Sequence, residues 1–341
     1  MVNINTTSTP FEIRPSVRVG ETADVYLQRT LTILRNENVN PTVTMEMFPA
    51  RDGILCGIDE VLMLLEEVLP DTGVEVWSLE EGEHIYEGEV VLRVRAPYSS
   101  FGLYETSICG TLASCTAWAT AARECVDAAG GAVDGIPVVA MSARHVHPNI
   151  AANIDYSAVR GGCTSCSTIM GARMAGVTPE GDMPHALPLL LGDSVRAIRS
   201  FDRYLPQGVP RVALVDTFKD EAEEALNVAQ ALRDRLRGIR LDTPAERGGV
   251  SIELVKEVRA RLDQAGLRHV EIVVSGGFTP DRIRDFVSAS TPVDRFIVGS
   301  YISDAAPNNF TADIHEIDGR PIAKRGRIPG VTANPRLDRK I

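Results

Sequence analysis

The sequence VEIVVSGGFTPDRIRDFVSASTPVDRFIVGS, residues 270–300, indicates the fold class. It contains two short apolar runs, at 270–275 and 295–299, and a polar stretch of helical character at 280–290 joins them. Two β-branched runs with a helix between them predict a βαβ unit, whose strands are parallel. The runs end in small polar residues, so each strand is expected to open into a loop that a ligand can approach.

The same alternation of short β-branched runs with helices extends back to about residue 130. Further strands are predicted at 137–141, 211–216 and 239–242, and further helices at 220–237 and 251–265. The last four strands end about 25–35 residues apart, which is typical of a (β/α) repeat. No sequence repeat is visible. We therefore predict an α/β barrel-like domain.

Polar residues follow each of the five predicted strands. Serine, threonine, aspartate and glycine are common in turns and helix caps, so one such end would mean little. Five of them at the carboxyl ends of parallel strands are how a barrel builds an active site. The residues are Ser142, Arg144, His145, Asp216, Thr217, Arg240, Asp242, Thr243, Ser275, Gly276, Gly277, Gly299 and Ser300.

The first part of the chain mixes helix and strand without this regular alternation. In chain order, we expect a helix over 21–36, a strand over 42–48, a helix over 58–69, strands over 74–79 and 90–96, and a long helix over 104–128. Strict alternation in 42–48 predicts a half-buried strand, with Thr44 and Glu46 facing outward. This pattern predicts an α+β layer with an antiparallel sheet.

Composition excludes several classes of protein. The 341 residues carry 35 Lys+Arg against 46 Asp+Glu, a net charge of −11, which argues against a nucleic-acid-coating surface. No apolar run approaches the ~20 residues of a membrane span, and we expect a cytoplasmic protein without membrane partners. Cys163 and Cys166 form the one CxxC, and they are predicted to be buried thiols, not metal ligands or a redox pair.

The strand ends suggest phosphate chemistry. Glycines ahead of the helix that begins near Thr279, and again at Gly299, let an anion approach backbone N–H groups. Asp216 and Asp242 can hold Mg²⁺ or ribose hydroxyls, or can simply cap helices. The arginines provide fixed charge for a carboxylate or phosphate. A histidine near phosphate, such as His185, suggests a proton shuttle or a nucleophile, with a structural role as the alternative.

These segments resemble the nicotinate phosphoribosyltransferases over about residues 20–325. The matching segments are SARHVHP (142–148), GDMPHAL (181–187), VDTF (215–218), IRLDT (239–243), VSGGF (274–278) and GSYIS (299–303). The resemblance implies an irregular, incomplete α/β barrel over residues 131–304. It also implies an N-terminal sandwich domain over 1–130 that the tail, about 305–341, completes.

The resemblance also implies a reaction. Nicotinate and phosphoribosyl pyrophosphate would give nicotinate mononucleotide and pyrophosphate in NAD biosynthesis, with Mg²⁺. ATP hydrolysis is coupled to this reaction in many members, which classifies them as ligases. The enzymes of this family are usually homodimers whose sites lie at the subunit boundary.

Residue roles follow from the same resemblance. Tyr26 and Tyr156 match the aromatic residues on the two faces of the pyridine ring, and Arg240 matches the arginine near nicotinate. His185 matches the histidine that ATP phosphorylates. Asp216 and Asp242 would be catalytic and hold Mg²⁺. The residues expected to bind phosphoribosyl pyrophosphate are Arg144, His145, Ser275, Gly276, Gly277, Gly299 and Ser300.

Alternatives stay open at this point. Asp182 stands where the family commonly has Thr. A carboxylate at this position would repel the carboxylate of nicotinate but can accept a hydrogen bond from the amide of nicotinamide. Quinolinate is a further candidate base, although residues 142–180 contain only Arg144, Arg160 and Arg173 as arginines or lysines. A non-catalytic nucleotide-binding homologue is the alternative of another class, against which the retained aspartates, glycine loops and His185 argue.

Overall fold

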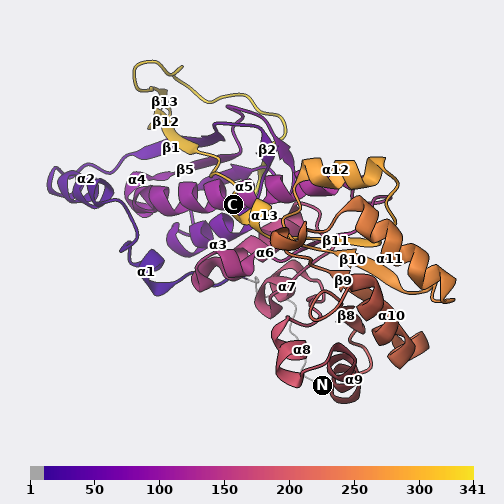
Figure 1. Ribbon diagram of the computed structural model, residues 1–341. Helices are drawn as coiled ribbons and strands as arrows, with labels where there is room; N and C mark the ends of the chain where they lie inside the picture. The colour runs from indigo at the N-terminus through magenta and orange to yellow at the C-terminus, as the bar shows by residue number, and fades with distance from the viewer. Residues whose placement is uncertain (1–10) are drawn as a thin grey trace. The chain divides into compact units, whose positions relative to one another are not determined.

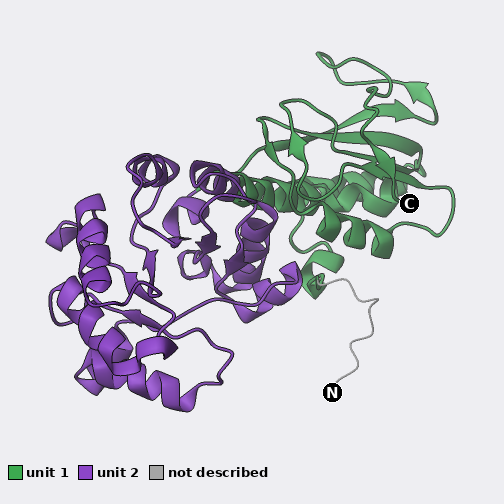
Figure 2. Cartoon of the chain, turned by 90° about the vertical axis from the view of Figure 1, so that its right-hand side faces the viewer, with its two compact units in different colours: residues 1–120, 305–341 green, residues 121–304 purple. Residues whose placement is uncertain are grey.

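The computed structural model describes residues 11–341, which divide into two compact units (Figure 2). The described residues of unit 1 are 11–120 and 305–341, and unit 2 comprises Ala121–Asp304. The first division falls inside the long helix α5 (Glu105–Ala128), not after it at residue 130. Each unit has its own sheet.

Unit 1 contains an antiparallel sheet of six strands. Their spatial order is β13 (Arg320–Pro321), β12 (Phe310–Ile317), β1 (Thr42–Pro49), β5 (Leu92–Pro97), β3 (Glu75–Ser78) and β14 (Asp338–Arg339). The strands β12, β13 and β14 come from the end of the chain, so residues about 270 positions apart in sequence pair side by side. A separate pair joins β2 (Gly53–Ile54) to β4 (His84–Ile85).

The core of unit 1 lies between this sheet and the helices. Val43, Met45 and Met47 of β1 point into it, together with Val61 and Leu65 of α3 (Ile58–Val68) and the first turns of α5. The shorter helices are α1 (Pro15–Arg18), α2 (Val25–Asn36) and α4 (Tyr98–Phe101). The helices α2, α3 and α5 and the strands β1, β3 and β5 lie within a few residues of their predicted bounds.

The prediction that β1 is half-buried is wrong. Thr44 and Glu46, expected to face outward, are 3% and 0% exposed. The Glu46 carboxylate pairs with Arg93 at 2.7 Å and accepts the backbone N–H of Thr332 at 3.1 Å. Part of the C-terminal tail therefore lies against the second face of the sheet at Glu46, and ion pairing makes burial of this carboxylate tolerable.

Unit 2 contains a parallel sheet of six strands. Their order is β7 (Ser165–Cys166), β6 (Val138–Ala140), β11 (Arg295–Val298), β10 (Glu271–Val274), β9 (Gly238–Leu241) and β8 (Val212–Leu214). Every pairing is parallel, and β7 and β8 end the sheet without pairing with each other. The predicted fold class, a mixed α/β protein with an incomplete α/β barrel, is confirmed.

Helices connect and cover these strands. They are α6 (Ala151–Arg160), α7 (Ile169–Ala175), α8 (Ala186–Leu191), α9 (Ser194–Tyr204), α10 (Glu221–Leu232), α11 (Ile252–Gln264), α12 (Pro280–Ser288) and α13 (Ser300–Ser303). Figure 1 shows α10, α11 and α12 along the outside of strands β8 to β11. Apart from Arg240, which lies within β9, the polar residues predicted at the strand ends come just after the strands and begin the loops.

Cys163 and Cys166 are 3% and 0% exposed, and both are free thiols, as predicted. Burial raises the pKa of the Cys166 thiol to about 12. Within residues 11–341, no helix combines the length and the apolar character needed to cross a membrane.

Candidate functional site

A cavity of about 370 Å³ opens at the carboxyl ends of the parallel strands of unit 2. It collects the loops that follow β6, β9, β10 and β11 together with the segment around residue 182. Ten residues predicted from the strand ends and motifs line it: Arg144, His145, His185, Arg240, Asp242, Ser275, Gly276, Gly277, Gly299 and Ser300. The residues predicted from strand ends and motifs therefore make up most of the lining of this cavity.

Arg240, on β9, is a hub of the cavity. Its Nε–H donates to Asp182 at 2.6 Å, and its Nη1 donates to Asp242 at 3.0 Å and to the Ser275 hydroxyl at 3.1 Å. Its Nη2 donates to the Met183 carbonyl at 2.9 Å. Arg240 thus links the end of β10 and the segment before α8 to its own strand, β9. Few of its N–H groups remain to bind a ligand.

The Asp182–Arg240 pair is buried, with side chains 10% and 8% exposed. Burial raises the pKa of Asp182, although the Arg240 guanidinium opposes that shift. Burial also disfavours the charged form of Arg240, but Asp182 and Asp242 outweigh it and raise the pKa of the guanidinium. The interpretation of Asp182 as a free carboxylate facing the base is therefore not supported, because Asp182 faces Arg240.

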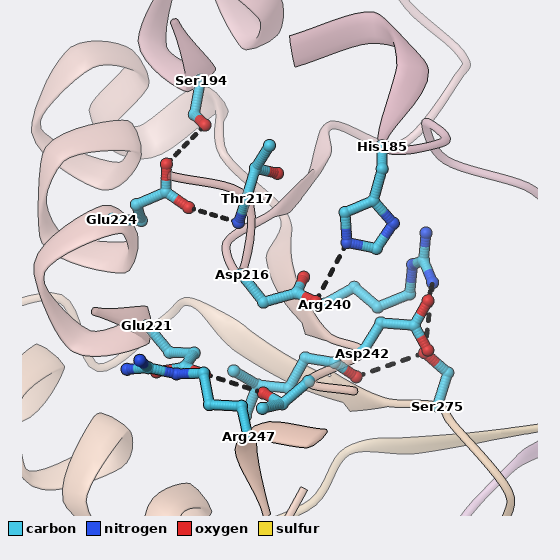
Figure 3. A network of polar contacts seen from close by, with 12 residues as sticks. His185, Ser194, Asp216, Thr217, Glu221, Glu224, Arg240, Asp242, Arg247 and Ser275 are labelled. Carbon is cyan, nitrogen blue, oxygen red and sulfur yellow. Dashed lines mark hydrogen bonds and ion pairs between the residues drawn. The ribbon is translucent and has the colours of Figure 1, made fainter. Parts of the chain in front are cut away.

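Asp242 is the most accessible carboxylate of this network, with its side chain 27% exposed. Its Oδ1 accepts the Ser275 hydroxyl at 2.8 Å, and its Oδ2 accepts from Arg240 (Figure 3). Both partners hold the carboxylate in one orientation at the cavity wall. A fixed, partly hydrated carboxylate of this kind suits ribose hydroxyls or a hard cation.

His185 forms a dyad with Asp216. The His185 Nε2 lies 3.0 Å from Asp216 Oδ2, and the imidazole is 38% exposed whereas Asp216 is 1% exposed. Burial raises the pKa of Asp216, and the contact with His185 moderates that rise. Asp216 Oδ1 is buried without a hydrogen-bond partner. Asp216 does not line the cavity, so this placement suits orientation of His185 better than direct contact with a metal ion.

Two glycine loops border the cavity. Gly276 and Gly277 have φ of 93° and 68°, which other residues rarely adopt. Arg282 donates to the Gly276 carbonyl and to the Val250 carbonyl, and its guanidinium lies 4.2 Å from the centroid of the Phe278 ring. The loop is thereby held ahead of α12, where backbone N–H groups favour an anion.

The second loop leaves no room for a side chain. A Cβ added at Gly299 would lie 2.9 Å from the Met141 carbonyl oxygen, closer than such contacts occur. We expect Gly299→Ala to lower the free energy of unfolding by about 1–3 kcal/mol, because overpacking moves the backbone. It should also weaken the binding of a phosphate monoester in calorimetry, because the loop would no longer present its backbone N–H groups correctly. The control is Gly208→Ala, where the added Cβ meets nothing within 4 Å. Equal melting temperatures and affinities for the two variants would contradict this reading of the loop.

The two aromatic predictions have different surroundings. Tyr156 on α6 is 1% exposed, does not line the cavity, and packs under the guanidinium of Arg160 at 4.8 Å. This burial does not support contact with a pyridine ring. Tyr26 on α2 of unit 1 is 55% exposed, so it is available to a ligand or a partner.

Two buried glutamates on the first turn of α10 escaped the sequence analysis. Glu224 accepts the backbone N–H of Thr217 at 2.9 Å, next to Asp216, and also the Ser194 hydroxyl (Figure 3). Glu221 accepts the Thr243 hydroxyl at 2.9 Å and pairs with Arg247. Burial acts to raise the pKa of Glu221, but hydrogen bonds, first from Arg247, lower it overall. Acidic residues are ordinary at helix starts, so no signal marked them.

The sequence and the fold are similar to those of known proteins. The family model described as "Quinolinate phosphoribosyl transferase, N-terminal domain" matches residues 24–116, and the model of the C-terminal domain matches residues 118–313. A crystal structure of nicotinate-nucleotide pyrophosphorylase from Pyrococcus furiosus is 40% identical with a TM-score of 0.86, over 94% of this chain and 81% of that one. Human nicotinic acid phosphoribosyltransferase, at 18% identity and a TM-score of 0.68 over 90% and 77% of the two chains, shares the fold.

Curated relatives carry the name that the motifs suggested. Nicotinate phosphoribosyltransferase pncB2 of Mycobacterium tuberculosis (strain CDC 1551 / Oshkosh) is 32% identical over 231 residues, which is 67% of this chain and 48% of that protein. The Bacillus subtilis (strain 168) nicotinate phosphoribosyltransferase is 26% identical over 67% and 46% of the two chains. The chain thus spans about half the length of these relatives. With the C-terminal family model alone covering more than half of its residues, the chain belongs to the quinolinate phosphoribosyl transferase family.

Proposed function

We propose that this protein transfers the phosphoribosyl group of phosphoribosyl pyrophosphate to nicotinate, giving nicotinate mononucleotide and pyrophosphate for NAD biosynthesis. The observation that carries the proposal is the convergence of two glycine loops, Asp242 and Arg144 on one cavity. Anion-binding loops and an accessible carboxylate are what a ribose bearing phosphates at both ends requires. Relatives named nicotinate phosphoribosyltransferase support the choice of base.

The chain's own residues would act mainly by holding and neutralising. The loops at Gly276 and Gly299 hold the 5′-phosphate, and Arg144 and His145, both exposed at the cavity, face the pyrophosphate. The pyridine nitrogen attacks C1′ with its lone pair, and the C1′–O bond breaks with its electrons leaving on pyrophosphate. No protein nucleophile is needed, so stabilisation of the leaving charge is the main catalytic task.

The proposal includes Mg²⁺, which Asp242 would hold together with the substrate phosphates. Residues 11–341 contain no cluster of three or more His, Cys, Asp or Glu side chains that can hold a metal ion. Mg²⁺ commonly binds through one or two carboxylates plus substrate phosphates, and the exposed edge of Asp242 fits that mode. The bound ion would supply charge neutralisation to pyrophosphate. The buried Asp216 fits such a role poorly.

Quinolinate is the second candidate base. The name of the matching family favours it. The cavity lining argues against it. Among the residues that the structure describes, Arg144 and Arg240 are its only arginines or lysines, and Arg240 pairs with two carboxylates. Nicotinamide has lost its main support, since Asp182 faces Arg240.

One product assay tests the proposal. The full chain is incubated with phosphoribosyl pyrophosphate and Mg²⁺ and with nicotinate, quinolinate or nicotinamide, each with and without ATP. We expect nicotinate mononucleotide from nicotinate, and pyrophosphate in equal amount. Product from quinolinate alone, with release of carbon dioxide, would transfer the assignment to the second candidate. No product from any base would overturn the transferase activity.

ATP coupling, and with it the ligase classification, rests on His185 as a phosphoryl acceptor. The exposed imidazole at the cavity and its buried orienting carboxylate support this part of the proposal. Homodimeric assembly, which the family resemblance implies, and a cytoplasmic location, which the sequence led us to expect, also belong to the proposal.

Tyr26→Ala is expected to raise KM for nicotinate several-fold, leaving the affinity for phosphoribosyl pyrophosphate nearly unchanged. The reason is loss of a ring stack worth about 0.5–1.5 kcal/mol. Tyr86→Ala is a matched control, because Tyr86 is 56% exposed in the same unit. A lower melting temperature with an unchanged KM would show instead that Tyr26 only packs its own helix.

A further inference from the structure

The side chains that line the cavity cancel in charge. Counting arginines, lysines and carboxylates among the described residues, the charged lining side chains are Arg144, Arg240, Asp182 and Asp242, two positive and two negative. Phosphoribosyl pyrophosphate brings several negative charges of its own. A cavity of this kind has little positive charge left for an anionic base.

Asp182 neutralises the charge of Arg240, which is more buried than Arg144. It lies 2.6 Å from Arg240 Nε, and both side chains are about nine-tenths buried. A buried ion pair is costly to desolvate, and a neutral amide would satisfy the single Nε–H equally well. The Met183 carbonyl, a neutral acceptor, already accepts a hydrogen bond from Arg240 Nη2 at 2.9 Å. Holding Arg240 in place therefore does not by itself require a charge at position 182.

We propose that Asp182 is a specificity-determining residue that limits the aromatic base to a single carboxylate by cancelling the charge of Arg240. The inference rests on the proposed function for the identity of the base class. Asp242 is a poorer candidate for this task, because it is more exposed and also shares its carboxylate with Ser275. An aromatic base with two adjacent carboxylates would need the positive charge of Arg240, which Asp182 already neutralises.

Asp182→Asn and Asp182→Ala separate charge from contact. The asparagine variant keeps an oxygen for Arg240 Nε–H but removes the charge, and the alanine variant removes both. Dissociation constants for quinolinate and for nicotinate are measured by calorimetry on each folded variant. The ratio of the two reports specificity and cancels general damage to the cavity. Asp234→Asn, at an exposed position on the 3₁₀ turn Arg233–Arg235, is the control with the same change of charge.

We expect both Asp182 variants to shift the ratio toward quinolinate by about tenfold, because one unscreened charge is restored to the cavity. The control should not move it. An asparagine variant with the wild-type ratio, together with an alanine variant that weakens both ligands equally, would overturn the proposal and leave Asp182 a positioning residue. Nicotinate turnover by the wild type is read separately. Its absence would end the proposed function, while the ratio of dissociation constants would still decide the role of Asp182.

Discussion

Asp242→Asn is expected to lower kcat for nicotinate turnover by about 100-fold or more, with a melting temperature close to that of the wild type. Its carboxylate is the accessible one at the cavity wall, and Arg240 and Ser275 fix its orientation. Loss of one preorganised electrostatic contact to the reacting group typically has an effect of this order. The amide keeps one oxygen for Ser275 or Arg240, so the cost to folding is small.

The measurement pairs steady-state kinetics with thermal denaturation. Asp234→Asn provides the same change of charge outside the cavity and should leave both quantities unchanged. Turnover within a few-fold of wild type in the Asp242 variant would place the reacting ribose elsewhere. A large fall in melting temperature together with activity would assign Asp242 to the support of the Arg240 network alone.

The strand pattern predicted which residues would gather at the cavity, because most of them directly follow strands in the sequence. Ser275, Gly276 and Gly299 follow strands directly, and parallel strands bring their carboxyl ends to one edge. The period-3.6 and period-2 patterns set the helices and strands within a few residues. Both depend only on which side chains neighbour each other along the chain.

What could not be predicted depends on partners distant in sequence. The burial of Glu46 comes from the tail around residue 332, nearly 290 positions away, and no alternation within 42–48 contains that information. The capture of Arg240 by Asp182 joins residues 58 positions apart. Tyr156 was assigned from a resemblance, and its burial under Arg160 depends on how α6 packs. Pairings of this kind are determined by tertiary contacts, which override local pattern.

The largest expected effect concerns His185, which should acquire an acid-labile phosphoryl group from γ-labelled ATP. Its Nε2 lies at Asp216 Oδ2, so the carboxylate fixes the N–H on that nitrogen and leaves the Nδ1 lone pair as the nucleophile (Figure 3). Nδ1 would attack the γ-phosphorus, and the bond to the ADP oxygen would break with its electrons leaving on ADP. His185→Asn should abolish the label, and analysis of the phosphohistidine isomer should place it on Nδ1.

His147→Asn is the matched control and should keep the label, because His147 lies outside the cavity lining and caps the turn Pro148–Ile150. Asp216→Asn should reduce labelling strongly, since the amide can present its N–H to Nε2 and reverse the tautomer. A phosphoryl group adds about two negative charges beside Arg144 and Arg240, and this explains physically how ATP would change substrate affinity. Wild-type protein that takes no label, with nicotinate turnover indifferent to ATP, would exclude the acceptor role. The transferase proposal would then rest on Asp242 and the glycine loops alone.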